Sequence, residues 1–157
     1  RTFLIQSPVM DSSTRALNVN AQEETRKLLA KNETRIQAWN LVREAQNAAL
    51  RLVKPGVTCA QVAEAARKVI VDGGYGPMYA YFTHRLGHGI GIQGHEDPYL
   101  VESNSDTVLQ EGMTFSIEPG IYVMGDFGVR LEDIVQVTST GYKVFGNMAK
   151  SVEQPID

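Results

Sequence analysis

Residues 84–95 of this 157-residue chain read HRLGHGIGIQGH and contain all 3 of its histidines. Histidine is the side chain whose proton and lone pair are most available near neutral pH. The glycines between the histidines allow the backbone to approach a ligand closely. The segment therefore predicts metal binding or acid–base chemistry, rather than a polar turn with incidental histidines. The intervening glycines are Gly87, Gly89, Gly91 and Gly94.

Two short patterns in this segment match well-known motifs but lack the context that the motifs need. Residues 89–94 satisfy G-x-G-x-x-G, which binds a dinucleotide only where it opens a helix. The acidic, proline-containing residues 95–98 do not offer such a helix start, so nucleotide binding is not expected. His84 and His88 have the spacing of H-E-x-x-H, but Arg85 stands where that motif has its glutamate. A zincin site on a helix is therefore not expected either.

The composition is that of one globular domain with an ordinary surface. The chain is 43% hydrophobic and 21% charged. No apolar run approaches the roughly 20 residues that a membrane span requires, so no membrane contact is expected. The net charge of −3 offers no basic surface for nucleic acid. The single cysteine, Cys59, cannot form an internal disulfide, which fits a reducing compartment and favours a cytoplasmic location.

The N-terminal part of the chain predicts a strand followed by a helix. Residues 1–6 are typical of a strand, and residues 9–22 are polar and expected to be irregular. Residues 23–53 favour a helix, because apolar residues recur every three to four positions and form one face. Pro55-Gly56 is expected to end this helix.

A second helix is expected to start after Thr58. Thr58 and Gln61 have the spacing of a capping box, in which each residue caps the other's backbone. The helix is expected to run to Asp72 and to end at Gly73-Gly74. Cys59 would lie in its first turn, where a small residue is interpreted as packing rather than as a nucleophile.

The remainder of the chain predicts short antiparallel strands. Alternation of polar and apolar residues is visible in residues 114–118 and 129–132. The second pattern continues to Thr138, and residues 142–145 are expected to return as a hairpin. The residues after Met148 are expected to be a surface extension. A strand, two helices and then an antiparallel sheet define the α+β class.

Three potential metal ligands are spread over different predicted elements. His88 lies in the glycine-rich segment, Glu118 on the polar face of one strand, and Glu132 beside Arg130 on another. Either glutamate alone is typical of a solvated surface. Hard carboxylates with one imidazole favour Mn, Co, Fe or Zn over a structural thiolate zinc site. Together with the clustered histidines, they predict a metal site formed by converging strands.

Three motifs in this order resemble those of the pita-bread-fold metallopeptidases, the group of aminopeptidase P, prolidase and methionine aminopeptidase. They are HRLGHGIGIQGHEDP at residues 84–98, GMTFSIEPGIY at 112–122 and GVRLEDIVQVT at 128–138. The last two are more similar to the Xaa-Pro aminopeptidase and prolidase branch than to the methionine branch. The resemblance runs from Arg1 to about Phe145. It implies that residues 1–157 are the C-terminal half of a pita-bread domain, with two helices packed on a curved antiparallel sheet.

The resemblance also implies which residues hold the metal. His88 and Glu118 would ligate one ion, and Glu132 would bridge two ions. The complete enzyme would use two divalent ions, of which Mn is favoured and Co, Zn and Fe are alternatives. Metal charge would lower the pKa of a bound water that attacks the scissile carbonyl.

The remaining matched positions belong to the substrate pocket. The resemblance implies that Glu118 also carries protons during the reaction. His84 and His95 would hydrogen-bond the peptide carbonyl or the developing oxyanion. Arg130 would orient the carboxylate ligands, and Tyr122 would donate a hydrogen bond to the reacting centre.

The chain departs from the family pattern at its start. The family's two-metal centre needs two aspartates just upstream of a segment like Arg1-Thr2-Phe3, and no aspartate of this chain lies in that context. We therefore expect an incomplete site with little activity alone, completed by the upstream part of the same protein or by a separate upstream chain. Peptides with proline at the second position are the expected substrates, and a homodimer is one assembly considered.

Two other functions share this scaffold. Creatinase-type amidinohydrolases have the same fold with another substrate class. A pita-bread protein can also act as a non-catalytic binding module. The second alternative predicts eroded ligand positions, whereas every ligand position after Arg1 is intact in this chain.

Overall fold

The computed structural model describes the backbone of residues 2–6 and 19–154 and the side chains of residues 23–154. One strand is followed by two helices and seven further strands, as the α+β prediction requires. None of the described helices is both long and apolar enough to cross a bilayer. The elements are β1 (Thr2–Gln6), α1 (Val19–Leu52), α2 (Cys59–Asp72), β2 (Gly87–Gly89), β3 (Glu96–Leu100), β4 (Thr114–Ile117), β5 (Gly120–Val123), β6 (Phe127–Leu131), β7 (Asp133–Val137) and β8 (Tyr142–Phe145).

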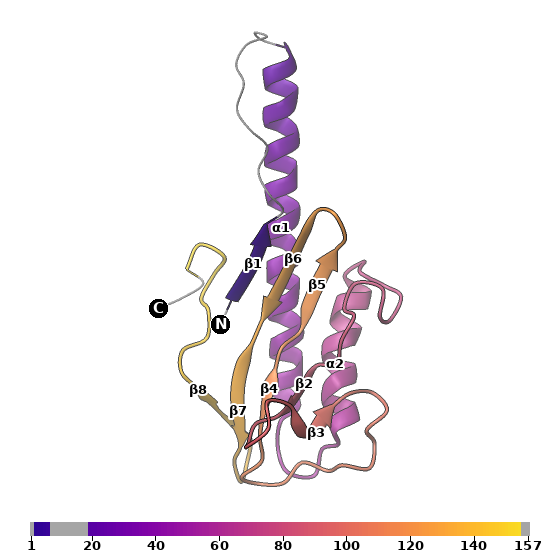
Figure 1. Cartoon of the computed structure of the whole chain (residues 1–157), viewed down its shortest axis with the longest axis vertical. Helices are drawn as coiled ribbons and strands as arrows, with labels where there is room; N and C mark the ends of the chain where they lie inside the picture. The colour runs from indigo at the N-terminus through magenta and orange to yellow at the C-terminus, as the bar shows by residue number, and fades with distance from the viewer. Residues whose placement is uncertain (1, 7–18, 155–157) are drawn as a thin grey trace.

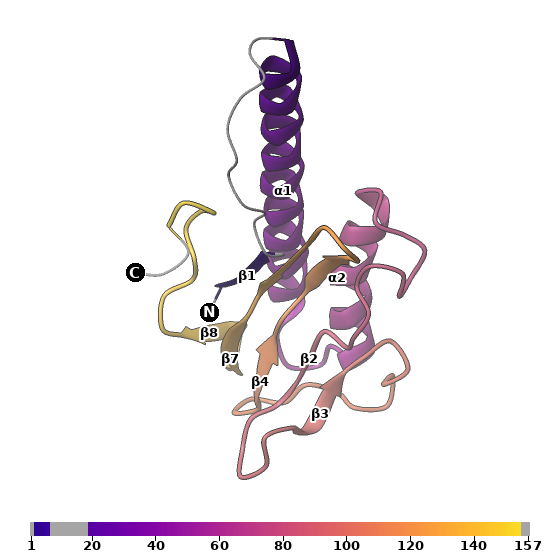
Figure 2. The same cartoon turned by 45° about the horizontal axis from the view of Figure 1, so that its top comes forward.

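The strands form two antiparallel ladders that lie in front of the two helices (Figure 1). One ladder has the order β1-β6-β5, and the other has the order β3-β2-β4-β7-β8. The tilted view in Figure 2 shows the same arrangement, with α1 and α2 on one side of the strands. The fold is therefore two helices packed on antiparallel strands, as expected.

Both ladders are made from the same two stretches of chain. β4 leads into β5 and β6 leads into β7, with a break of one or two residues in each stretch. Ile117 pairs with Asp133 on one side of the break, and Gly120 pairs with Arg130 on the other. Pro119 lies in the break, where its missing N–H cannot disturb either ladder. The expected curved sheet is thus built as two ladders that meet there.

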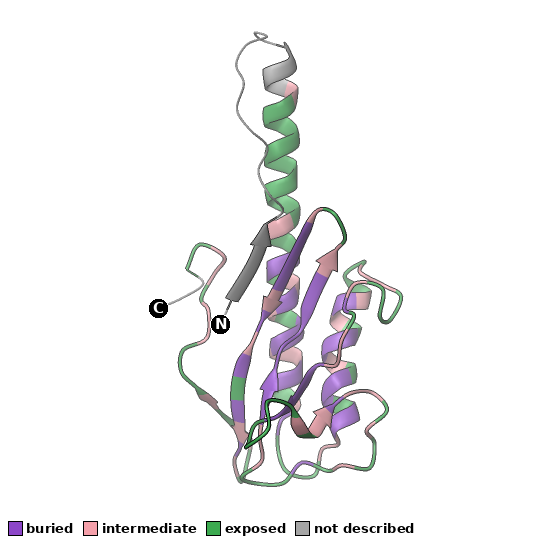
Figure 3. Cartoon of the chain, in the orientation of Figure 1, coloured by how far each residue is buried: buried purple, intermediate pink, exposed green. Residues whose placement is uncertain are grey.

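The two helices differ in how much of each packs against the body. α2 begins and ends as predicted: Thr58 and Gln61 form the capping box, and Gly73 caps the last turn. α1 begins at Val19, whereas residues 19–22 were expected to be irregular, so that prediction was wrong there. Residues 24–34 are all exposed, and this part of α1 extends away from the strands (Figure 3). Residues 7–18 lie outside the described part of the chain.

The core lies between the helices and the strands. α1 contributes a buried face from Ala38 to Leu50, and this face packs with buried residues of α2 and the strands. The C-terminal segment also joins the core, because Ala149 and Val152 pack against it and Arg43 donates a hydrogen bond to the Ala149 carbonyl. The expectation of a surface extension after Met148 was therefore wrong for Ala149 and Val152, because these residues contact the core and α1.

The glycine-rich segment enters the sheet as β2 rather than opening a helix. β2 pairs with β3 and β4, so the G-x-G-x-x-G match is followed by a strand. A Cβ on Gly87 would lie 1.8 Å from the Ser116 carbonyl oxygen, and one on Gly89 would lie 2.1 Å from the Asp97 carbonyl oxygen. Glycine is required here because neighbouring backbone passes too close for any side chain.

Candidate active site

A cavity of about 690 Å³ brings most of the predicted site residues together. His84, His88, His95, Glu118 and Arg130 line it, although they come from different elements. Tyr122 contacts the lining through His84, and Glu132 contacts it through Arg130. Glu132 itself lines a neighbouring cavity. The sequence analysis missed three lining residues of the first cavity, Arg85, Tyr99 and Val101.

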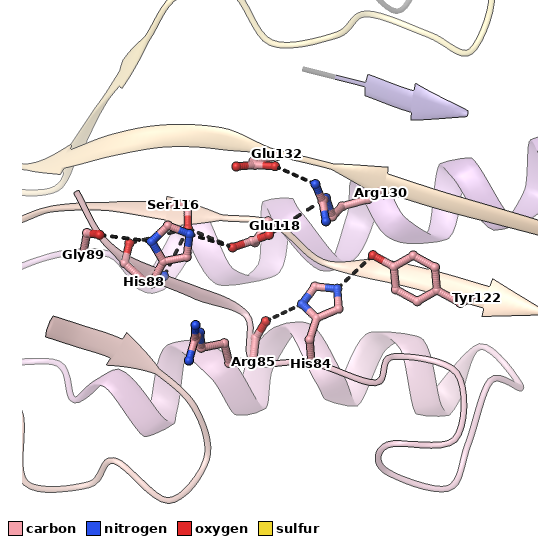
Figure 4. A network of polar contacts seen from close by, with 9 residues as sticks. All are labelled: His84, Arg85, His88, Gly89, Ser116, Glu118, Tyr122, Arg130 and Glu132. Carbon is pink, nitrogen blue, oxygen red and sulfur yellow. Dashed lines mark hydrogen bonds and ion pairs between the residues drawn. The ribbon is translucent and has the colours of Figure 1, made fainter. Parts of the chain in front are cut away.

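His88 and Glu118 form the centre of the site (Figure 4). Both side chains are buried, and His88 Nε2 lies 3.3 Å from Glu118 Oε1. His88 Nδ1 lies 3.0 Å from the Gly89 carbonyl oxygen, which can only accept, so the hydrogen of neutral imidazole belongs on Nδ1. The Nε2 lone pair then faces a carboxylate oxygen. A proton or a metal cation between these two atoms would relieve the repulsion, so the pair fits a cation.

Ser116 is another residue whose role was not predicted from the sequence. Its hydroxyl donates to Glu118 Oε1 at 3.1 Å and accepts from the His88 backbone N–H at 3.0 Å. Ser116 lies two positions before Glu118, so strand alternation already put the two on one face. That face is buried in the structure, and Ser116 therefore fixes the orientation of the carboxylate.

Glu118 and Glu132 share one cation, Arg130. Arg130 Nη2 lies 3.2 Å from Glu132 Oε2, and Arg130 Nε lies 3.9 Å from Glu118 Oε2. Burial raises the pKa of Glu118, and the charge of Glu132 raises it further, while Ser116 and Arg130 act in the opposite direction. Two carboxylates beside a single guanidinium leave an excess of negative charge, which is the environment that a bound cation prefers.

His84 and Tyr122 form a polar pair at the edge of the cavity. His84 Nε2 lies 2.9 Å from the Tyr122 phenol oxygen, and His84 Nδ1 lies 2.7 Å from the Arg85 carbonyl oxygen. Burial lowers the pKa of His84, and the positive charge of Arg130 lowers it further. His84 is therefore held in its neutral form. His95 also lines the cavity and lies edge-on to His88, with 4.3 Å between ring centroids.

A buried arginine of α2 holds the backbone that carries His84. Arg67 is 2% exposed and forms an ion pair with Glu102. Its guanidinium also donates to the carbonyls of Phe82 at 2.6 Å and His84 at 2.8 Å. Arg67 therefore joins the segment before His84 to the segment after β3. Val101 of the latter segment lines the cavity.

The donor set fits a divalent metal in its chemistry but is not gathered into a complete coordination sphere. One imidazole and two carboxylates are ligands that Mn, Co, Fe and Zn accept. Across the residues that the structure describes, no group of three or more His, Cys, Asp and Glu side chains is close enough to hold an ion. The described side chains thus provide the His88–Glu118 pair, with Glu132 linked to Glu118 through Arg130.

Comparison with known proteins identifies one family. The sequence profile of metallopeptidase family M24 matches residues 13–139. An Xaa-Pro dipeptidase of Lactobacillus delbrueckii subsp. lactis is 48% identical over 117 residues, which cover 74% of this chain and 31% of that protein.

Solved structures of similar proteins agree with this match. The prolidase of Pyrococcus furiosus is 44% identical, with a TM-score of 0.64 over 68% of this chain and 31% of its own. The X-Pro aminopeptidase of Thermotoga maritima is 37% identical, with a TM-score of 0.68 over 76% of this chain and 32% of its own. The chain thus spans less than a third of the length of these relatives.

Proposed function

Because this chain belongs to metallopeptidase family M24, we propose that it is the C-terminal part of the catalytic domain of an Xaa-Pro exopeptidase. The complete enzyme would be a metal-dependent hydrolase of the aminopeptidase P or prolidase type. One observation carries the proposal: His88 Nε2 and Glu118 Oε1 face each other, 3.3 Å apart, in a cavity lined by two more histidines.

We assign the metal-holding role to His88, Glu118 and Glu132. A divalent ion bound there would supply Lewis-acid charge to the scissile carbonyl and lower the pKa of a bound water. Mn is favoured by the two carboxylates, while Co, Zn and Fe are alternatives. Within this arrangement Arg130 balances the charge of both glutamates and holds Glu132 in one orientation.

The other residues of the cavity would act on the substrate. Glu118 is a buried carboxyl group that lines the cavity, where it would take a proton and return it to the leaving amine. His84 is neutral, and its contacts use both its own hydrogen and that of Tyr122, so the phenol would have to turn away from His84 to donate a hydrogen bond to the substrate. His95, which also lines the cavity, would hydrogen-bond the peptide carbonyl or the developing oxyanion.

The upstream part of the protein is the partner that would complete the site. β1 pairs with β6 in an antiparallel register in which Thr2 lies opposite Leu131. Chain that continued β1 toward its N-terminal end in this register would pass beside Glu132, the residue after Leu131. Two upstream aspartates would therefore enter the site next to the proposed bridging ligand.

We propose peptides with proline at the second position as the substrates. The relatives are an Xaa-Pro dipeptidase, a prolidase and an X-Pro aminopeptidase, so their names share the Xaa-Pro bond but differ in peptide length. The proposal therefore covers both dipeptides and longer peptides. We also propose a homodimer and a cytoplasmic location.

The test is hydrolysis of an Xaa-Pro dipeptide and a longer Xaa-Pro peptide with excess Mn²⁺ and with a chelator. We expect the 157-residue chain alone to be nearly inactive, and the protein extended upstream by a segment with two aspartates to be active and chelator-sensitive. If the extended protein with Mn²⁺ cleaves neither peptide, the exopeptidase proposal is wrong. Turnover of creatine-like substrates would then support the amidinohydrolase alternative, and inactivity toward both classes would support the binding module.

A further inference from the structure

A buried glutamine on α1 contacts β4 and β7, the strands next to the two proposed glutamate ligands. Gln46 is 0% exposed. Its side-chain nitrogen Nε2 donates to the Ile117 carbonyl oxygen at 3.2 Å and to Asp133 Oδ2 at 2.9 Å. Both hydrogens of the amide are therefore used, one on β4 and one on β7.

The two acceptors are the immediate neighbours of the two glutamates. Ile117 directly precedes Glu118, and Asp133 directly follows Glu132. Ile117 and Asp133 are also cross-strand partners in the β4–β7 ladder. The amide thus binds the last register pair of that ladder, at the point where the two ladders meet and the glutamates leave the strands.

The amide of Gln46 is held in one orientation. Arg43 Nη1 donates to Gln46 Oε1, so the oxygen faces the guanidinium and the NH₂ group faces the strands. Arg43 is itself tied to the C-terminal segment through the Ala149 carbonyl. A flip of the amide would place its oxygen against two acceptors, which this contact prevents.

Helix packing alone does not explain an amide at this position. The neighbouring inward positions of α1 are Val42, Ala45 and Ala49, all 0% exposed and apolar. An apolar side chain at position 46 would avoid the cost of burying an amide but would leave the Ile117 carbonyl and the buried Asp133 carboxylate without this donor. The amide is therefore explained by its partners, Ile117 and Asp133, which are the neighbours of the two glutamates of the site.

We propose that Gln46 is a positioning residue that sets the spacing and orientation of Glu118 and Glu132 for the metal. This inference rests on the proposed function, because it assumes that the two glutamates hold an ion. Gln46 acts through the backbone of β4 and the Asp133 carboxylate and does not touch the ion. Removal of such outer partners lowers metal affinity by about 10- to 100-fold in metal sites generally.

The first test measures Mn²⁺ binding by calorimetry in the complete protein. Gln46→Met keeps the approximate side-chain volume but removes both donors, and it is expected to weaken Mn²⁺ binding by about tenfold or more. Val42→Ala is the matched control, since it also perturbs a fully buried position of α1 but makes no polar contact with the strands. We expect it to lower the melting temperature while Mn²⁺ affinity stays within twofold of wild type. Equal losses of affinity in the two variants, or wild-type affinity in Gln46→Met, would overturn the proposal.

The second test exchanges the amide and the carboxylate. Gln46→Glu places two carboxylates against each other and is expected to weaken Mn²⁺ binding. Adding Asp133→Asn restores a donor–acceptor pair in the reverse direction, with Arg43 still beside residue 46. We expect the double variant to regain part of the lost affinity but not all of it, because the Ile117 carbonyl stays without its donor. A double variant that binds Mn²⁺ more weakly than Gln46→Glu would overturn the proposal.

The same measurements separate this inference from the proposed function. Wild-type protein that binds Mn²⁺ and cleaves no Xaa-Pro peptide would refute the exopeptidase proposal and leave the affinity comparison decisive for Gln46. Wild-type protein that binds Mn²⁺ and cleaves the peptide, with Gln46→Met unchanged in affinity, would refute the role of Gln46 alone.

Discussion

The Nε2 atom of His84 lies 2.9 Å from the phenol oxygen of Tyr122, which joins the loop before β2 to strand β5. The Arg85 carbonyl fixes the hydrogen of His84 on Nδ1, so Nε2 accepts the hydrogen of the phenol. Both ring nitrogens of His84 are hydrogen-bonded, and the Tyr122 phenol also interacts with the Arg130 guanidinium. Two residues of the cavity therefore behave as one polar unit.

Tyr122→Phe removes the donor of this unit and leaves His84 Nε2 without its partner. We expect the free energy of unfolding to fall by about 1 kcal/mol. In the complete protein, kcat for an Xaa-Pro peptide should fall by about tenfold or more, with a smaller change in KM. Denaturant titration and steady-state kinetics measure these effects. Tyr142→Phe on β8, where the ring is exposed, is the control and should change neither; a Tyr122→Phe enzyme with wild-type kcat would contradict the assigned role.

The lowered pKa of His84 predicts a pH dependence of stability. The folded chain binds a proton at His84 more weakly than the unfolded chain does, where the pKa is near 6.5. The stability that neutral His84 contributes is therefore complete above pH 6.5 and is lost as the pH falls through the lower folded pKa. Urea titrations of wild type and His84→Gln between pH 5 and pH 8 check this. We expect the wild type to lose more stability on the acid side, and parallel curves for the two proteins would contradict the prediction.

Arg67→Met is expected to destabilise the chain by about 3 kcal/mol, because it leaves the largely buried carboxylate of Glu102 and several carbonyls without their donor. The control is Arg51→Ala, which breaks an exposed pair with Glu44 and should cost less than about 1 kcal/mol. Both values come from denaturant titration. Similar losses in the two variants would show that the Arg67 contacts are no stronger than a surface pair.

Cys59 should be unreactive in the folded chain. The side chain is fully buried, and burial raises the pKa of its thiol to about 11. The thiolate that attacks an alkylating reagent is therefore scarce at neutral pH and is also shielded. We expect iodoacetamide to label Cys59 only after denaturation, as measured by mass spectrometry. Rapid labelling of the native protein would contradict the interpretation of Cys59 as a packing residue.

Glu132→Gln should remove activity from the complete protein without unfolding it. The amide keeps the shape of the side chain but loses the charge that pairs with Arg130 and that would bridge two ions. We expect kcat to fall by at least about 100-fold, with a melting temperature within a few degrees of wild type. Turnover near the wild-type level would refute the bridging role.

Local patterns in the sequence predicted local structure well. The capping box of Thr58 and Gln61 and the end of α2 at Asp72 follow from contacts within a few residues, and both predictions are confirmed. Residues 19–22 of α1 were missed because polar residues with no apolar periodicity gave no sign of a helix. Residues 24–34 were predicted to be helical and are helical, although all of them are exposed.

The site was predicted in part, for a physical reason. Clustered histidines and glutamates indicated the centre, and His84, His88, His95, Glu118 and Arg130 do line one cavity. Tyr99 and Val101 went unnoticed because their residue types carry no chemical signal, and only the fold of β3 brings them to the cavity. The role of Gln46 was not predicted, because its two acceptors on the strands lie 71 and 87 positions away in the sequence.

The pairing of β1 with β6 has a consequence during synthesis of the protein. Thr2 lies opposite Leu131, so β1 is matched with a strand translated more than a hundred residues later. At about 5–20 residues per second, the ribosome needs on the order of ten seconds to supply that partner. During this time the edge of β1 is open to any other extended chain nearby. Newly made chains are therefore prone to aggregate through β1, and a chaperone that shields this strand would act before β6 is translated.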